Sequence, residues 1–134
     1  MKVILDSNAL FAPIHFKIDI FQQLDMLLKR RYTPILLSPV RQELERLARG
    51  KSPKTLKEAC FALRLAEKCK LVEVDADATV SVDDLIVKVA GEWNCPVFTN
   101  DRQLKRRLRD INVPVIHVRQ KSQLRIEGRL TAPV

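Results

Sequence analysis

Several features that would direct a protein out of the cytoplasm are absent from this sequence. No apolar run approaches the roughly 18 residues that a membrane-spanning helix needs, and the opening MKVILDSNAL is too short in apolar residues, and lacks a small-residue cleavage site, to be a secretion signal. The three cysteines, Cys60, Cys69 and Cys95, are odd in number and contain no C-x-x-C pair. They therefore cannot form a complete disulfide framework, and they lack zinc-ligand spacing. We expect a cytoplasmic protein without a membrane partner, in which the cysteines are buried as small hydrophobic residues.

The sequence has fewer acidic than basic residues. The 134 residues include 24 Lys and Arg against 16 Asp and Glu, which gives a net charge of +8, and a field of this size favours polyanionic partners. The excess is concentrated near the C-terminus, in nine basic residues: Arg102, Lys105, Arg106, Arg107, Arg109, Arg119, Lys121, Arg125 and Arg129. Composition alone leaves open whether they bind nucleic acid or form only a solvated helix face followed by a basic tail.

Apolar runs alternate with helical patterns along the chain. The runs predict strands at 3–5, 34–37, 71–74, 96–99 and 113–118, and the apolar periodicity predicts helices at about 21–28, 38–50, 52–70, 81–93 and 101–111. Ser38 and Ser52, each followed by proline, are the expected N-caps of two of these helices. The alternation predicts a three-layer α/β/α sandwich with a central, mainly parallel five-stranded sheet. We expect one domain over residues 1–134, with a basic tail of little periodicity at about 119–134.

Acidic residues follow the predicted strands or begin the predicted helices. Asp6 closes the first strand and Asp101 follows the fourth, while Glu43 and the pair Asp83 and Asp84 lie near helix starts. In parallel sheets these segments meet beyond the carboxyl ends of the strands. Carboxylates converging there repel one another unless a cation lies between them, and oxygen ligands suit Mg²⁺ or Mn²⁺. Such an ion activates water for the hydrolysis of a phosphodiester.

Two of these acids have a clear structural alternative. Asp101 could simply N-cap its helix, and Glu43 could form a surface ion pair with Arg46. Asp6 is harder to explain structurally, because an acid at the end of a buried strand is costly without a partner.

The acids at 83 and 84 have different expected tasks. Ser81 and Asp84 fit a capping box, and Asp84 shares its helix face with Lys88. Asp83 lies in phase with the inward-facing Ile86. We therefore expect Asp83 to be a metal ligand, and Asp84 to be a cap or an additional acid near the ion.

In four places the sequence resembles the PIN-domain nuclease family. The segments are V-I-L-D-S-N-A-L at the start, S-P-V-R-Q-E-L around Glu43, D-D-L-I at 83–86, and T-N-D at 99–101 followed by L-K-R-R-L. The last segment looks most like the archaeal and eukaryotic branch that includes ribosomal-RNA-processing members. The resemblance implies that Asp6, Glu43, Asp83 and Asp101 are catalytic acids that bind one or two divalent ions. It also implies that four polar neighbours support them: Ser7, Asn8, Thr99 and Asn100. The double acid at 83–84 departs from the family pattern and leaves the identity of the third ligand open.

These observations give a hypothesis of metal-dependent RNA hydrolysis, in ribosomal RNA processing or as a toxin-type ribonuclease controlled by an antitoxin. The basic residues expected to grip the RNA backbone are Arg102, Lys105, Arg106, Arg107, Arg109, Arg119 and Lys121. The alternative is a non-catalytic RNA-binding or ribosome-assembly factor of the same fold, and the resemblance also allows a homodimer. A dehalogenase-type phosphatase would need D-x-D where the chain has Asp6-Ser7-Asn8. A response-regulator receiver would need a lysine after the last strand, where His117-Val118-Arg119 stands.

Overall fold

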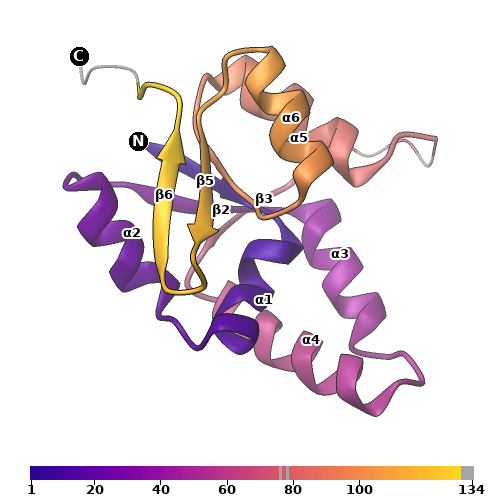
Figure 1. Cartoon of the computed structure of the whole chain (residues 1–134). Helices are drawn as coiled ribbons and strands as arrows, with labels where there is room; N and C mark the ends of the chain where they lie inside the picture. The colour runs from indigo at the N-terminus through magenta and orange to yellow at the C-terminus, as the bar shows by residue number, and fades with distance from the viewer. Residues whose placement is uncertain (76, 78, 131–134) are drawn as a thin grey trace.

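The computed structural model describes residues 1–75, 77 and 79–130. Strands and helices alternate along most of the chain (Figure 1). The strands are β1 (Lys2–Leu5), β2 (Thr33–Leu37), β3 (Lys70–Val72), β4 (Val97–Phe98), β5 (Val115–Arg119) and β6 (Gln123–Glu127). The helices are α1 (Ser7–Phe16), α2 (Ile20–Leu28), α3 (Ser38–Leu47), α4 (Pro53–Ala66), α5 (Val82–Trp93) and α6 (Arg102–Asp110).

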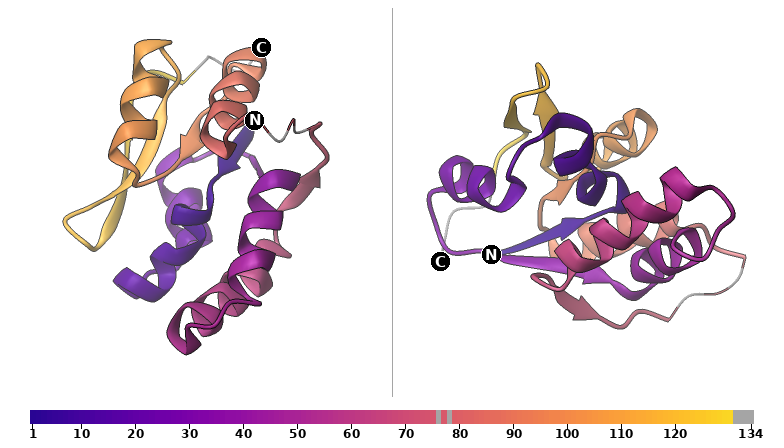
Figure 2. Two further views of the ribbon diagram at one scale, coloured as in Figure 1. Left: turned by 90° about the vertical axis from the view of Figure 1, so that its right-hand side faces the viewer. Right: turned by 90° about the horizontal axis from the view of Figure 1, so that it is seen from below.

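The strands form one sheet in the order β3-β2-β1-β4-β5-β6. The pairings among β1 to β5 are parallel, and β6 runs antiparallel to β5. In Figure 1 the helices α5 and α6 lie above the sheet and α1, α3 and α4 below it, and the turned views of Figure 2 show the same separation. The predicted three-layer α/β/α sandwich with a mainly parallel sheet is confirmed.

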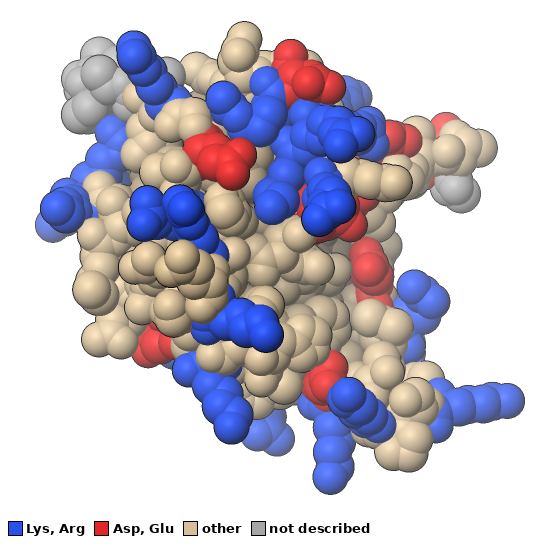
Figure 3. Space-filling model, viewed as in Figure 1, with Lys and Arg blue, Asp and Glu red and all other residues tan. Residues whose placement is uncertain are grey.

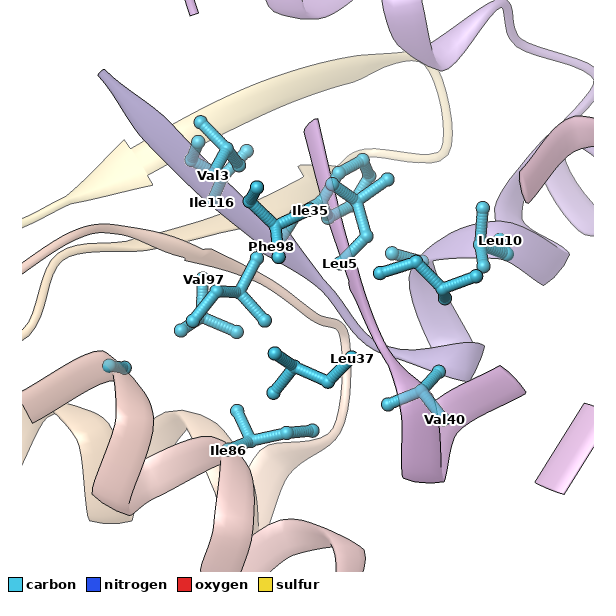
Figure 4. Packing of buried hydrophobic residues seen from close by; sticks show 14 of the residues in the cluster. Val3, Leu5, Leu10, Ile35, Leu37, Val40, Ile86, Val97, Phe98 and Ile116 are labelled. Atoms are coloured by element: carbon cyan, nitrogen blue, oxygen red, sulfur yellow. The ribbon is translucent and has the colours of Figure 1, made fainter. Parts of the chain in front are cut away.

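Burial on both faces explains why the central strands are continuous apolar runs. The register pairs Leu5 with Phe98 and Phe98 with Ile116, so these side chains share one face of the sheet. Leu37 lies on the opposite face and packs toward Ile86 of α5 (Figure 4). All five are essentially inaccessible to solvent. With both faces covered, only the ends of the strands are open to polar chemistry.

The sheet has six strands rather than the predicted five, because part of the expected tail forms β6. This strand pairs with β5 through a turn in which Gln120 and Lys121 adopt left-handed backbone angles. Leu124 is buried, and Ile126 is partly buried against the core. Residues 123–127 alternate strictly between polar and apolar side chains, which is a signal for a half-buried strand that the prediction of a tail with little periodicity overlooked. The ion pair of His117 Nε2 with Glu127 Oε1, at 3.1 Å, also joins the two strands.

Helix α1 lies in a stretch between residues 6 and 20 for which the sequence predicted neither a helix nor a strand. Pro13 lies inside the helix, and the buried residues Ala9, Leu10 and Ala12 form no wide apolar stripe. A proline and an irregular stripe are both signals against a helix. His15 therefore belongs to a helix, where its Nε2 lies 3.2 Å from Glu58 Oε2 of α4.

Two smaller expectations were wrong. Ser38 does not N-cap α3, because the capping position is Leu37 and the buried Ser38 hydroxyl instead accepts a hydrogen bond from the Val74 backbone at 2.9 Å. Cys60 is exposed, whereas Cys69 is partly buried and Cys95 is buried. The predicted N-cap Ser52 is confirmed.

Among the described residues, no helix has the length and apolar character to cross a membrane.

Candidate active site

Asp6 and Asp101 are linked through one buried threonine at the carboxyl edge of the sheet. Thr99 Oγ1 donates to Asp6 Oδ2 at 2.5 Å and accepts from the Asp101 backbone N–H at 3.0 Å. Asp6 also N-caps α1 by accepting from the Ala9 N–H, and Asp101 N-caps α6 by accepting from the Leu104 N–H. The capping role foreseen for Asp101 is therefore real, and it is compatible with ligand binding through the second carboxylate oxygen.

The buried carboxyl of Asp6 ionises less readily than an exposed one. Only 6% of the residue is exposed, and this burial raises the pKa of its carboxyl to about 7 against the opposing hydrogen bonds from Thr99 and Ala9. Asp83 and Asp101 raise the Asp6 pKa further through their charges. The carboxylates of Asp83 and Asp101 are thus close enough to Asp6 to disfavour its ionisation. A cation among them would relieve this cost.

The structure separates Asp83 from Asp84. Burial and the charge of Asp101 raise the pKa of Asp83. Asp84 is exposed, and hydrogen bonds from Arg107 and Ser81 lower its pKa. Its carboxylate accepts from the Arg107 guanidinium at 2.8 Å and completes the predicted capping box with Ser81. Asp83 therefore belongs to the acidic group, and Asp84 joins α5 to α6.

Glu43 of α3 is linked to the residue that follows Asp6. Its Oε1 accepts from the Ser7 hydroxyl at 3.4 Å, which joins α3 to the start of α1. The alternative ion pair with Arg46 is not found, because Arg46 is in none of the ion pairs of the described residues; the pair on this helix joins Arg41 and Glu45. Glu43 thus remains available to a ligand on the open side of the acids.

Asn8 and Asn100 hold the loop that carries Asp101. The Asn100 backbone N–H donates to Asn8 Oδ1 at 3.1 Å, and Asn100 Oδ1 accepts from the Val118 N–H at 2.8 Å. These bonds tie the loop after β4 to the start of α1 and to β5. Together with Thr99 and Ser7, all four predicted supporting residues lie around the acids.

The carboxylate oxygens suit a hard cation, although the side chains do not by themselves form a complete coordination shell. In the described ranges, no three His, Cys, Asp or Glu side chains lie close enough together to hold a metal ion directly. Mg²⁺ is usually bound by one or two carboxylates, with water and substrate phosphate oxygens completing its octahedron. An open group of repelling carboxylates fits that mode of binding.

Basic side chains cover the surface beside the acids. On the face shown in Figure 3, Lys and Arg gather at the top over α6 and continue over the β5–β6 hairpin, with carboxylates among them. Arg102 and Arg106 are exposed. Arg107 is paired with Asp84, and Arg109 donates to the Val113 carbonyl at 3.4 Å. The sequence contained no signal for the Asp84–Arg107 pair, because its members belong to different helices.

The fold and its acids define a protein with a three-layer α/β/α architecture and an acidic site at the carboxyl edge of the sheet. A family model described as a PIN-like domain matches residues 3–121. The chain belongs to this family, and the predicted membership is confirmed. Nucleases of the family generally use a divalent metal ion.

Individual relatives align over nearly the whole chain. Ribonuclease VapC4 of Methanocaldococcus jannaschii is 34% identical over 128 residues, which are 95% of this chain and 97% of that protein. Ribonuclease VapC9 of Archaeoglobus fulgidus is 27% identical over 124 residues, 92% of this chain and 87% of the relative.

Two solved structures share the architecture. The PIN domain endonuclease Utp24 superimposes with a TM-score of 0.80 and 29% identity, covering 99% of this chain and 96% of the other. VapBC2 from Rickettsia felis, bound to a DNA fragment from its promoter, gives a TM-score of 0.59 at 22% identity over 79% of this chain and 92% of the other. The second likeness shows the fold alone.

Proposed function

We propose that this chain is a divalent-metal-dependent endoribonuclease that hydrolyses RNA phosphodiester bonds with Mg²⁺ or Mn²⁺. The observation that carries the proposal is the placement of Asp6 at the carboxyl edge of the sheet, hydrogen-bonded to Thr99, where burial and the charges of Asp83 and Asp101 raise the pKa of its carboxyl. A cation bound at this position would offset the electrostatic cost of ionising Asp6. The names of the two archaeal relatives and of the endonuclease Utp24 support the same activity.

Each part of the site has a separate task in this proposal. Asp6, Asp83 and Asp101 would hold the ion, with Glu43 on the open side of the group and Asp84 outside it. When bound, the ion supplies an activated water and positive charge beside the phosphate. Thr99 keeps the Asp6 carboxylate in one orientation and holds the Asp101 backbone at the same time. The basic residues of α6 and of the β5–β6 hairpin would grip the RNA backbone without reading its sequence.

The test is RNA cleavage by the wild type and by Asp6→Asn in the presence of Mg²⁺ or Mn²⁺. We expect Asp6→Asn to lose about a thousandfold or more in rate, because metal stabilisation of the transition state is worth several kcal/mol. Its RNA affinity, measured by fluorescence anisotropy, should stay near the wild-type value. Equal cleavage by both proteins would refute the proposal. Tight RNA binding by a wild type that cuts nothing would instead support a non-catalytic RNA-binding or ribosome-assembly role.

Two cellular roles would use this activity, and each has its own support. Two relatives carry the name VapC, which favours a toxin-type ribonuclease held by a small antitoxin. The resemblance of residues 99–108 to the ribosomal-RNA-processing branch of the family favours processing of ribosomal RNA. Growth arrest on expression, relieved by a small protein encoded beside it, would establish the first role. Defects in ribosomal RNA maturation on deletion would establish the second, and size-exclusion chromatography tests the homodimer.

A further inference from the structure

A hollow of about 480 Å³ lies between α3 and α5, beside the proposed active site. Glu43 forms part of its wall, and Glu43 Oε1 accepts a hydrogen bond from the hydroxyl of Ser7, the residue after Asp6, so this wall adjoins the acids. The two helices lie one above the other at the right of Figure 1. This volume falls within the range of small-ligand sites, which is roughly 300–1,000 Å³. The hollow is therefore large enough for one nucleoside and shares Glu43 with the proposed site.

The apolar part of the hollow suits a flat, weakly polar group. Pro39 and Leu85 are buried at its base, and Val82 is half-buried in its wall. These three side chains come from the first turns of α3 and α5. Backbones in helical turns hold such a surface in place, so a ligand would meet a preformed wall.

The charged part of the hollow argues against a phosphate as its occupant. Glu43 and Asp77 contribute two carboxylates, and Arg46 contributes one cation. Hydrogen bonds from Thr79 lower the pKa of Asp77, so this acid remains ionised at neutral pH. A phosphate would be repelled by both acids. A nucleobase has donors and acceptors on its edge and an apolar face, and it matches both halves of the lining.

Arg46 is available to such a ligand. It is exposed, and its side chain makes no hydrogen bond or ion pair with another described residue. A planar guanidinium can stack on a base or donate two hydrogen bonds to its edge.

We propose that this hollow binds the base of a nucleotide next to the cleaved phosphate and so gives the enzyme its sequence preference. The inference rests on the proposed function, because it takes the scissile phosphate to lie at the acids. The pocket reads one unstacked base of single-stranded RNA, and α6 contributes affinity that is independent of sequence.

The test compares three substitutions of exposed arginines on or beside α3. Arg46→Ala removes the guanidinium, and Arg46→Lys keeps the charge but loses the planar fork. Arg49→Ala is the matched control, since it removes the same charge from an exposed residue outside the hollow. Cleavage sites are mapped on a pool of single-stranded RNA with randomised sequence. In the Asp6→Asn background, dissociation constants are measured for short RNAs that differ at a single base.

We expect the wild type to prefer particular bases at one position beside the cut. Arg46→Ala and Arg46→Lys should both reduce that preference about tenfold, a typical loss for one bidentate contact. Arg49→Ala should leave it unchanged. The inference is overturned if the wild type has no preference. It is also overturned if Arg46→Lys retains the preference, or if Arg46→Ala and Arg49→Ala weaken all sequences equally, as phosphate contacts would. A wild type that cuts no RNA refutes the proposed function, while base-dependent binding in the Asp6→Asn background tests the hollow separately.

Discussion

The acids at the sheet edge and the basic residues on α6 carry opposite charges, and the protein holds them in opposite ways. Asp6 is almost completely buried, and both of its oxygens accept hydrogen bonds from fixed donors. Arg102 and Arg106 extend into solvent. Burial makes the charge of Asp6 sensitive to its neighbours, whereas water and salt screen the arginines. The buried group is therefore suited to chemistry at one point, and the exposed group to diffuse attraction of a polyanion.

The pH dependence of stability should show the largest consequence of this difference. Asp6 loses its proton near pH 3.8 in the unfolded chain but only near pH 7 in the folded protein. The folded state therefore holds this proton more strongly, and the free energy of unfolding should fall as pH rises from about 4 to 7, by at most about 4 kcal/mol. Asp6→Asn should lose this dependence and become the more stable protein at pH 8.

Urea denaturation at pH 5 and pH 8, with a chelator present, measures this effect. Parallel pH curves for the two proteins would contradict the burial of an ionisable Asp6. Adding Mg²⁺ at pH 8 should restore stability to the wild type and not to Asp6→Asn, because the cation favours the ionised carboxylate.

Asp83 and Asp84 are adjacent on α5, so they allow a proposed metal ligand to be compared with an exposed acid in the same helical turn. Asp83→Asn should lower the cleavage rate about a hundredfold, because its carboxylate belongs to the proposed metal site. Asp84→Asn should change the rate by less than about fivefold, because its partner Arg107 is an exposed cation. Kinetics at saturating Mg²⁺ measure both variants. A larger loss from Asp84→Asn than from Asp83→Asn would reverse the assignment.

Substitutions of Thr99 test how strongly the pKa of Asp6 and the stability of the site depend on the Thr99 hydroxyl. Thr99→Val keeps the shape but removes the donor to Asp6 and the acceptor for the Asp101 N–H. We expect a destabilisation of about 1–3 kcal/mol, because a buried donor loses its partner. The pH profile of cleavage should shift to higher pH, since the pKa of Asp6 rises further without this bond. Thr99→Ser keeps the hydroxyl and should keep the wild-type profile; a shift in both variants would indicate a packing effect alone.

The exposed arginines should give the smallest effect for each residue changed. Replacing Arg102 and Arg106 by glutamine should weaken RNA binding equally for all sequences. It should also reduce the slope of log affinity against log salt by about 0.7 for each lost phosphate contact. The same change at Lys54 and Lys57 of α4 removes two exposed charges away from α6 and is the matched control. Equal slopes for the two double variants would show that α6 has no special role.

Much of this architecture was predictable from local patterns. Buried strands such as β1 are continuous apolar runs, and the capping box of Ser81 and Asp84 follows from the spacing of the two residues alone. Order along the chain placed Asp6 and Asp101 at one sheet edge, because parallel strands share their carboxyl ends. Strand β6 was missed because its alternation covers only five residues of a basic segment, and helix α1 because Pro13 argues against a helix. Contacts with distant segments hold both elements in place, β6 against β5 and α2, and α1 against α4 and α3.

Residue type, spacing and chain order were therefore sufficient for the fold class and the family, and they selected the acids that are proposed as the site. Local spacing could not supply the bridge from Thr99 to Asp6, the pairing of Asp84 with Arg107 or the hollow beside Glu43. Each of these joins segments that are far apart in the chain. Their pKa shifts and open volumes arise from burial and distance in three dimensions, and no sequence window contains either quantity.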